Sequence, residues 1–113
     1  MKKFLNRFSV DWANDCLENG DCEGAADAHY TRGIAYSVIQ DYEQGINHLS
    51  RAIELVPDFA SAYQYRGIAF AAMGKQKKAI ADLQKAAQLF LKQGNLEEHQ
   101  TALSTLREVE SPD

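Results

Sequence analysis

Apolar residues recur at helical intervals in the middle of the chain. Steps of three and four residues define two stripes, Ile46, Leu49, Ala52, Ile53 and Val56, then Ile80, Leu83, Ala86, Ala87 and Phe90. This period places each stripe along one face of an α-helix. Residues 28–39 and 62–73, which precede the stripes, are apolar or small at similar intervals. The pattern therefore predicts two pairs of short helices, each pair joined by a tight turn.

The two predicted helix pairs are copies of one unit. A shift of 34 residues places residues 26–59 on residues 60–93 with ten identical positions, whereas chance would give about two. In the first copy the repeated residues are Ala26, Ala28, Arg32, Gly33, Ile34, Ala35, Ile46, Leu49, Ala52 and Leu55. Such a repeat is typical of proteins that stack one helical unit on the next.

Several residues of the repeat have a defined conformational role. Gly74 is expected to adopt the left-handed conformation that ends a helix, and Pro57 cannot continue one. Asp58 is expected to cap the helix that follows. Gly33 and Gly67 stand at the same place in the two copies, although glycine within a helix costs about 1 kcal/mol relative to alanine. Their recurrence predicts a close approach of the two helices in each pair.

Other fixed places in the two copies hold characteristic residues. In the first copy they are His29, Arg32, Gly33, Tyr36, Gly45, Leu49, Ala52 and Pro57. In the second copy they are Tyr63, Arg66, Gly67, Phe70, Ala79, Leu83, Ala86 and Leu91. With the 34-residue period, these residues resemble the tetratricopeptide-repeat (TPR) family over 68 of the 113 residues. His29, Gly45 and Leu91 depart from the family's aromatic residue, alanine and proline, and without that proline the last helix is expected to continue through Lys92 toward Gly94.

The repeat and the resemblance predict a single all-α domain, a right-handed α-solenoid of stacked antiparallel helix pairs. The expected divisions are an N-terminal capping helix and connection (1–25), two repeats (26–59 and 60–93), and a C-terminal solvating helix and tail (94–113). Terminal helices are expected because a stack of repeats leaves apolar surface at both ends. Two repeats are fewer than the roughly three that usually make a stable array, which favours oligomerisation or unusually important caps.

Both terminal segments carry helical apolar stripes. In the first segment, helical steps separate Leu5, Phe8, Trp12 and Cys16, and residues 20–25 are expected to form the connection. The alternative is exchange of this segment between the protomers of a dimer. In the last segment, Asn95 and Glu98 resemble a capping box, and the stripe that follows is His99, Ala102, Leu103, Leu106 and Val109. The last helix is expected to cover the second repeat, with partner binding as its alternative role.

Composition and charge narrow the classes of function. Of the 113 residues, 45% are hydrophobic and 25% charged, with a formal charge of −4 at pH 7. These values are ordinary for one globular domain, and the negative balance argues against nucleic-acid binding. No apolar run approaches the roughly 20 residues that cross a bilayer, and Asn6, Arg7 and Asp11 interrupt a possible secretory signal. The chain is therefore expected to be cytoplasmic, without membrane insertion, and to hold Cys16 and Cys22 as thiols.

Candidate chemical sites lack the spacing that their chemistry requires. Cys16, Cys22 and His29 do not match the paired ligands of structural zinc. Residues 74–78 lack the pattern of a phosphate-binding loop, and no hydrolase or metalloprotease motif is present. A protein without catalytic residues, metal or cofactor is therefore expected, and a small enzyme with an unrecognised site is the rival.

Acidic residues concentrate near the start of the first repeat. Residues 11–27 contain six acidic residues and no basic one. A calcium loop at this place would have Tyr30 in the position of its bidentate glutamate, so calcium binding is not expected. The segment is expected to be a solvated acidic edge, with a docking site for a basic peptide as the alternative.

The resemblance also implies a binding surface, because in TPR proteins the first helix of each pair lines the concave face of the stack. The corresponding residues, called the groove residues below, are Asp27, Tyr30, Thr31, Ile34, Ser37, Val38, Ser61, Gln64, Tyr65, Ile68, Ala71 and Ala72. Tyr30 and Tyr65 would offer broad contact area, and Ile34 and Ile68 an apolar floor. Such a surface suits an amphipathic helix or an extended peptide.

The expected function is therefore that of a non-catalytic adaptor that binds a peptide or protein partner in the concave groove. The alternative is a structural homo-oligomer that uses the groove or the N-terminal helix for self-association. Some TPR proteins grip a C-terminal carboxylate with basic residues and asparagine on this face. Tyr30, Ile34 and Tyr65 hold those places here, which disfavours the acidic tail of a chaperone. Ile34 and Ile68 could also serve to pack under a terminal helix.

Overall fold

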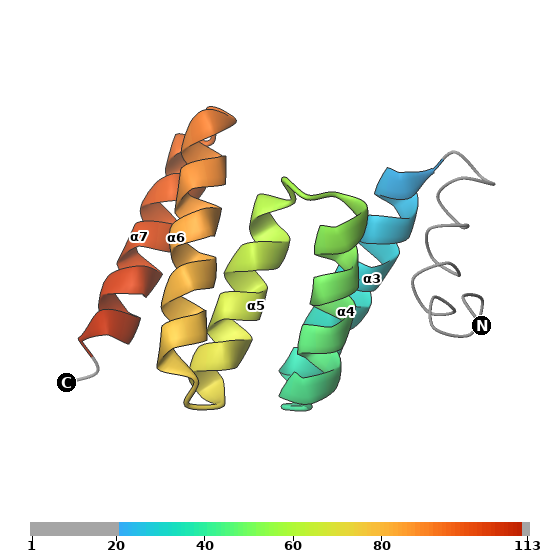
Figure 1. Cartoon of the computed structure of the whole chain (residues 1–113), viewed down its shortest axis with the longest axis horizontal. Coiled ribbons are helices and arrows are strands. Elements are labelled where there is room, and N and C mark those ends of the chain that lie inside the picture. Colours follow the sequence, from blue (N-terminus) through green and yellow to red (C-terminus); the bar gives the residue numbers. More distant parts are fainter. Residues whose placement is uncertain (1–20, 112–113) are drawn as a thin grey trace, which may run out of the picture.

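The computed structural model describes residues 21–111, and helices account for most of this range (Figure 1). The helices are α3 (Cys22–Val38), α4 (Tyr42–Leu55), α5 (Ala60–Ala72), α6 (Gln76–Lys92) and α7 (Leu96–Glu110). No strand occurs within residues 21–111, and the prediction of an all-α fold is confirmed there. The helix predicted from Leu5 to Cys16 lies outside the described residues.

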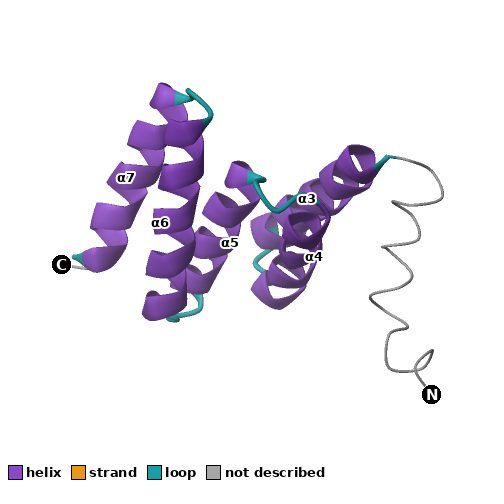
Figure 2. Ribbon diagram, turned by 45° about the horizontal axis from the view of Figure 1, so that its top comes forward, coloured by secondary structure: helices purple, strands orange, loops and turns teal. Residues whose placement is uncertain are grey.

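The helices stack in chain order as antiparallel pairs (Figures 1 and 2). Helix α3 packs on α4 and α5 packs on α6, while contact between α4 and α5 joins the two pairs. Helix α7 packs on α6 and extends the stack. The α4–α5 and α6–α7 connections lie at the upper end in Figure 1, as does the beginning of α3. This arrangement is the solenoid of helix pairs that the repeat predicts.

The predicted stripes form the core, which consists of two apolar clusters. The first cluster is Ala26, Leu49, Ala52, Ile53 and Ala62, and the second is Ala60, Ala86, Ala87, Leu89, Phe90 and Ala102. Leu49 and Leu83, at the same place in the two copies, are fully buried. Tyr63 packs against both clusters and so connects the first repeat to the second.

The close approach predicted at the repeated glycines is confirmed. A Cβ atom added at Gly33 would lie 2.6 Å from Cγ of Leu49, and one added at Gly67 would lie 2.9 Å from Cγ of Leu83. Non-bonded carbon atoms are ordinarily about 3.5–4.0 Å apart. Each leucine of the core therefore occupies the space that any larger residue would need on the facing helix.

Two predicted helix ends are confirmed and two predicted caps are wrong. Helix α4 ends before Pro57, and α6 continues through Lys92, as expected. Asp58 does not cap α5, because the helix begins one residue later and its N-cap is Phe59, which makes no side-chain cap hydrogen bond. Asn95 is the N-cap of α7 but makes no side-chain cap hydrogen bond either, so the predicted capping box is not formed.

The beginning of α3 also differs from expectation. The Asp21 carboxylate accepts a hydrogen bond of 2.7 Å from the Gly24 backbone N–H, and the helix starts at Cys22. Such an N-cap stabilises the first turn, so the connection predicted for residues 20–25 is wrong from Cys22 onward. Cys22 is disulfide-bonded, so the thiol expected at this position is also wrong.

Left-handed backbone closes the turns after α3, α5 and α6. Gly74 has a φ of 78°, which confirms the prediction for this residue, and Gly94 has a φ of 77°. Gln40, 34 residues before Gly74, is the non-glycine residue with positive φ in the described part of the chain, at 67°. The first repeat therefore holds a residue with a Cβ where the second repeat holds glycine.

Replacing Gln40 by glycine is expected to stabilise the domain by about 0.5–1 kcal/mol. A left-handed conformation costs a residue with a Cβ about 1–2 kcal/mol. Glycine avoids this cost, but its greater freedom in the unfolded chain cancels part of the gain in stability. Urea denaturation of Gln40→Gly beside the unchanged protein measures the difference. Exposed Gln44→Gly, inside α4, is the control and is expected to destabilise by about 1 kcal/mol.

His29 takes the place of the family's aromatic residue and packs among other rings. Its ring centroid lies 5.4 Å from that of His48, which in turn lies 5.5 Å from that of Tyr36. The Nδ1 atoms of the two histidines are 3.2 Å apart. Burial lowers the pKa of His48 below its ordinary value, and the positive charges of Arg51 and Arg32 act in the same direction. The neutral form of His48 is therefore the one that this packing favours.

Helix α7 turns its predicted apolar stripe toward α6. Ala102 is fully buried, Leu103 packs against the second cluster, and His99 Nδ1 lies 2.8 Å from the Ala87 carbonyl oxygen. Glu97, Gln100 and Ser104 are exposed on the other faces.

Candidate partner-binding face

The first helices of the stack share one face. Helix α5 touches both α3 and α7 in addition to the second helices of the pairs. All twelve groove residues lie on α3 and α5. The structure leaves half of them exposed, namely Asp27, Thr31, Val38, Tyr65, Ile68 and Ala72. Partly buried are Tyr30, Ile34, Ser37, Ser61 and Ala71. We call this surface the α3/α5 face.

Gln64 and Ser37 differ from the other groove residues in what their side chains do. Gln64 is only 6% exposed, so it offers little contact area to a partner. The Ser37 hydroxyl donates a hydrogen bond of 3.0 Å to the Gly33 carbonyl oxygen of its own helix. Fewer side chains of this face are therefore available for contact with a partner than the sequence predicts.

An aromatic cluster joins α3 to the beginning of α5 on the α3/α5 face. The Tyr30 ring lies 4.8 Å from the Phe59 ring and 5.9 Å from the Tyr65 ring, centroid to centroid, with an edge-to-face arrangement in the second pair. Tyr65 is 39% exposed and Ile68, one turn further along α5, is 38% exposed. Large side chains that are held by ring contacts yet remain accessible lose little entropy when a partner covers them.

The electrostatic surroundings of Tyr30 are negative. Burial raises the pKa of the Tyr30 phenol above its ordinary value, while a hydrogen bond with Ser61 acts in the opposite direction. The carboxylates of Glu98 and Asp27 raise this pKa further. Glu98 belongs to α7, so three successive first helices contribute to the surroundings of this tyrosine.

A hollow of about 300 Å³ lies at the upper end of the same face. Its walls include Asp27, Ser61 and Asn95, which follow one another at the 34-residue interval of the repeat. The remaining residues that line it are Glu23, Val56, Asp58, Phe59, Ala60, Phe90 and Gln93. Asn95 thus contributes to the hollow, in place of the capping bond predicted for it.

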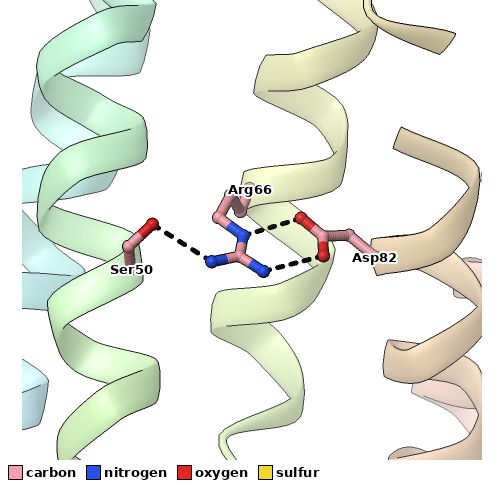
Figure 3. A network of polar contacts seen from close by, with 3 residues as sticks. All are labelled: Ser50, Arg66 and Asp82. Carbon is pink, nitrogen blue, oxygen red and sulfur yellow. Dashed lines mark hydrogen bonds and ion pairs between the residues drawn. The ribbon is translucent and has the colours of Figure 1, made fainter. Parts of the chain in front are cut away.

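Arg66 fixes the geometry behind this face (Figure 3). Its guanidinium donates two hydrogen bonds to the Asp82 carboxylate, at 2.7 and 2.9 Å, and one to the Ser50 hydroxyl at 3.1 Å. The paired hydrogen bond to Asp82 raises the pKa of Arg66. Ser50 belongs to α4 and Asp82 to α6, so one side chain of α5 links both repeats. A bidentate pair of this kind is geometrically specific.

Sequence reasoning missed Arg66, Asp82 and Phe59 as determinants of this face. A signal for the first two was present, because arginine recurs at positions 32 and 66 and Asp82 is the single acidic residue of α6. Phe59 lies in the connection before α5 and carries no periodic signal.

The described residues contain neither a candidate metal site nor a candidate membrane-spanning helix. Within residues 21–111, no group of three or more His, Cys, Asp or Glu side chains is arranged to hold a metal ion. No helix of that range combines the length and the apolar character needed to cross a bilayer.

Comparison with known proteins identifies the class. The family model of the TPR repeat matches residues 39–74. Over 75 residues, the chain is 29% identical to DnaJ homolog subfamily C member 7 of Mus musculus and 27% identical to the Homo sapiens protein of that name. These matches cover 66% of this chain and 15% of each relative. The chain thus spans about 15% of the length of these curated relatives.

Solved structures of the same architecture are also similar. A crystal structure of MamA has a TM-score of 0.55 and 25% identity, and covers 78% of this chain and 60% of its own. A second MamA structure has the same TM-score with 26% identity, and covers 76% of this chain and 55% of its own.

The stacked helix pairs, the 34-residue repeat and these matches together support a TPR protein, with the family model placing a TPR repeat at residues 39–74. TPR domains bind proteins or peptides and are in general non-catalytic scaffolds, so the chain is a protein–protein interaction module in this general sense.

Proposed function

We propose that this chain is a non-catalytic adaptor that binds a peptide, or a short segment of a partner protein, on the α3/α5 face. The observation that carries the proposal is the aromatic cluster of Tyr30, Phe59 and Tyr65, beside accessible Ile68. Aromatic residues that are both rigid and accessible are typical anchors of binding energy. The Arg66 network holds α5 between α4 and α6, so the face is organised before the partner arrives.

Replacing both Tyr65 and Ile68 by alanine is expected to weaken partner binding at least about ten-fold, because anchor residues typically contribute more than 1 kcal/mol each. The binding partner is first selected from a phage-displayed library of random peptides, and its affinity is then measured by fluorescence anisotropy. Leu91→Ala is the matched control, because Leu91 is 53% exposed but is not a groove residue. Equal affinities for all three proteins would contradict the proposal.

A structural homo-oligomer is the second candidate function. Val38 and Ile39 at the end of α3 are 75% and 70% exposed, and adjacent exposed apolar residues favour association with another surface. Light scattering over a concentration series measures the mass. A dimer that Val38→Ser with Ile39→Ser converts to a monomer would establish self-association at this end of α3.

A further inference from the structure

The hollow at the upper end of the α3/α5 face has an acidic wall. Glu23, Asp27 and Asp58 contribute carboxylates to it, and no lysine, arginine or histidine of the described residues lines it. None of the three carboxylates has an ion-pair partner within residues 21–111. Glu23 and Asp27 are four residues apart on α3 and therefore lie on the same side of the helix.

The base of the hollow is apolar and rigid. Phe90 is 2% exposed and Ala60 is 3% exposed, and both belong to the second core cluster. Val56 and Phe59 complete the apolar part of the lining and pack against the first cluster. The floor of the hollow is thus the outer surface of the core, which does not collapse into the space above it.

An apolar base beneath carboxylates that form no ion pair with another described residue matches one kind of side chain. Lysine and arginine have an aliphatic stem, which loses little by leaving water, and a cationic end, which attracts carboxylates. An acidic side chain would be repelled by the wall, and a purely apolar one would leave the carboxylates without a partner.

We propose that the hollow receives a lysine or arginine side chain from a basic peptide that also places an apolar side chain on Tyr65 and Ile68. This inference rests on the proposed function and specifies the chemistry of the partner. The negative surroundings continue beyond the hollow, because Asp27 and Glu98 both act on Tyr30. A basic peptide therefore meets favourable charge from the hollow to the aromatic cluster.

The distance between the hollow and Ile68 limits how far apart the basic and the apolar side chain of the partner can be. Ser61 in the wall and Ile68 are seven residues apart on α5, which corresponds to about 10 Å along a helix that rises 1.5 Å per residue. An extended peptide covers that distance in about three residues. A helical peptide covers it in about seven. The basic and the apolar side chain of the partner are expected at one of these two separations.

Selection from a phage-displayed library of random peptides tests the inference. The expected peptides carry lysine or arginine at one of these separations from an apolar residue. Asp27→Asn with Asp58→Asn is expected to bind a selected peptide about ten-fold more weakly, and higher salt to weaken binding to the unchanged protein. The control is Glu43→Gln with Glu110→Gln, which removes two exposed carboxylates outside the hollow, in the first turn of α4 and at the end of α7, and is expected to keep full affinity. Circular dichroism verifies that each variant is folded.

The possible results separate this inference from the proposed function. Selected peptides that depend on Tyr65 and Ile68 but contain no basic residue would overturn the inference and leave the proposed function intact. Basic peptides that bind the Asp27 and Asp58 variant with full affinity would also overturn it, because their site would lie elsewhere. If no peptide is selected, or if Tyr65 and Ile68 are not needed, both proposals fail.

Discussion

Gly67→Leu is expected to lower the free energy of unfolding by about 3 kcal/mol or more, beyond the usual cost of overpacking a core. A Cβ atom at this position would lie 2.9 Å from Cγ of Leu83 and 3.2 Å from the carbonyl oxygen of Ala79. Leu83 is fully buried and cannot move aside, and the Ala79 oxygen belongs to the backbone of α6. Helix α5 would therefore have to separate from α6, which disrupts the second repeat.

Urea denaturation and thermal melting measure this effect. Lys77→Ala is the control, because Lys77 is exposed in the first turn of α6 and its loss is expected to change stability by no more than about 0.5 kcal/mol. Gly67→Ala, which adds only the Cβ, is expected to fall between the two. Equal stability of Gly67→Leu and Lys77→Ala would contradict the assignment of the repeat to interlocking helix pairs.

The same glycine explains why the fold could be predicted from the sequence. An unfavourable residue that recurs inside a helix at the same place in both copies has to be maintained by packing, and the facing leucines recur as well. The period, the apolar stripes and the glycines all predict the same helix pairs, so errors at single positions do not change the architecture. The two wrong caps are examples. The N-cap of α5 is Phe59, one residue after Asp58, and Asn95 makes no side-chain cap hydrogen bond, but neither difference alters the stack.

The candidate site could be predicted less completely, because the period gives the side of a helix but not the depth of burial. Gln64 stands at the place of Tyr30 in the first copy, yet it is 6% exposed, and it belongs to α5, which contacts both α3 and α7. The hollow could not be predicted from the sequence for a related reason. Its lining comes from the first turns of α3 and α5, from Phe90 of α6 and from two connections, and their meeting at one end depends on how the pairs stack.

The Arg66 network shows the same limit. Arginine at this place departs from the leucine of the family's Leu-Gly pair, and by sequence alone Arg32 and Arg66 are equivalent. Their partners differ, because the residue 34 positions before Asp82 is His48. The second repeat therefore forms a bidentate ion pair, while Arg32 contributes a positive charge that lowers the pKa of His48. Arg66 thus meets a negative carboxylate on α6, whereas the equivalent Arg32 acts on the imidazole of His48 on α4 and disfavours its protonated form.

Removing the carboxylate of that pair by Asp82→Ala is expected to destabilise the domain by about 2–3 kcal/mol, somewhat less than for a fully buried pair. The Asp82 side chain is 9% exposed and the Arg66 side chain 21% exposed, so the variant leaves a largely buried guanidinium with the Ser50 hydroxyl as its remaining hydrogen-bond acceptor. Glu43→Ala, at an exposed acidic residue of α4, is the control and is expected to change stability by about 0.5 kcal/mol at most.

A double-mutant cycle separates the ion pair from the other contacts of Arg66, which include the Tyr63 and Phe70 rings at 5.4 and 5.8 Å. Arg66→Leu restores the apolar residue of the family, so the double variant with Asp82→Ala leaves no unpaired charge at this place. It is therefore expected to be more stable than Asp82→Ala alone, with a coupling energy of about 1.5–3 kcal/mol. If the two single changes are additive instead, the Arg66–Asp82 pair does not hold α5 against α6 energetically.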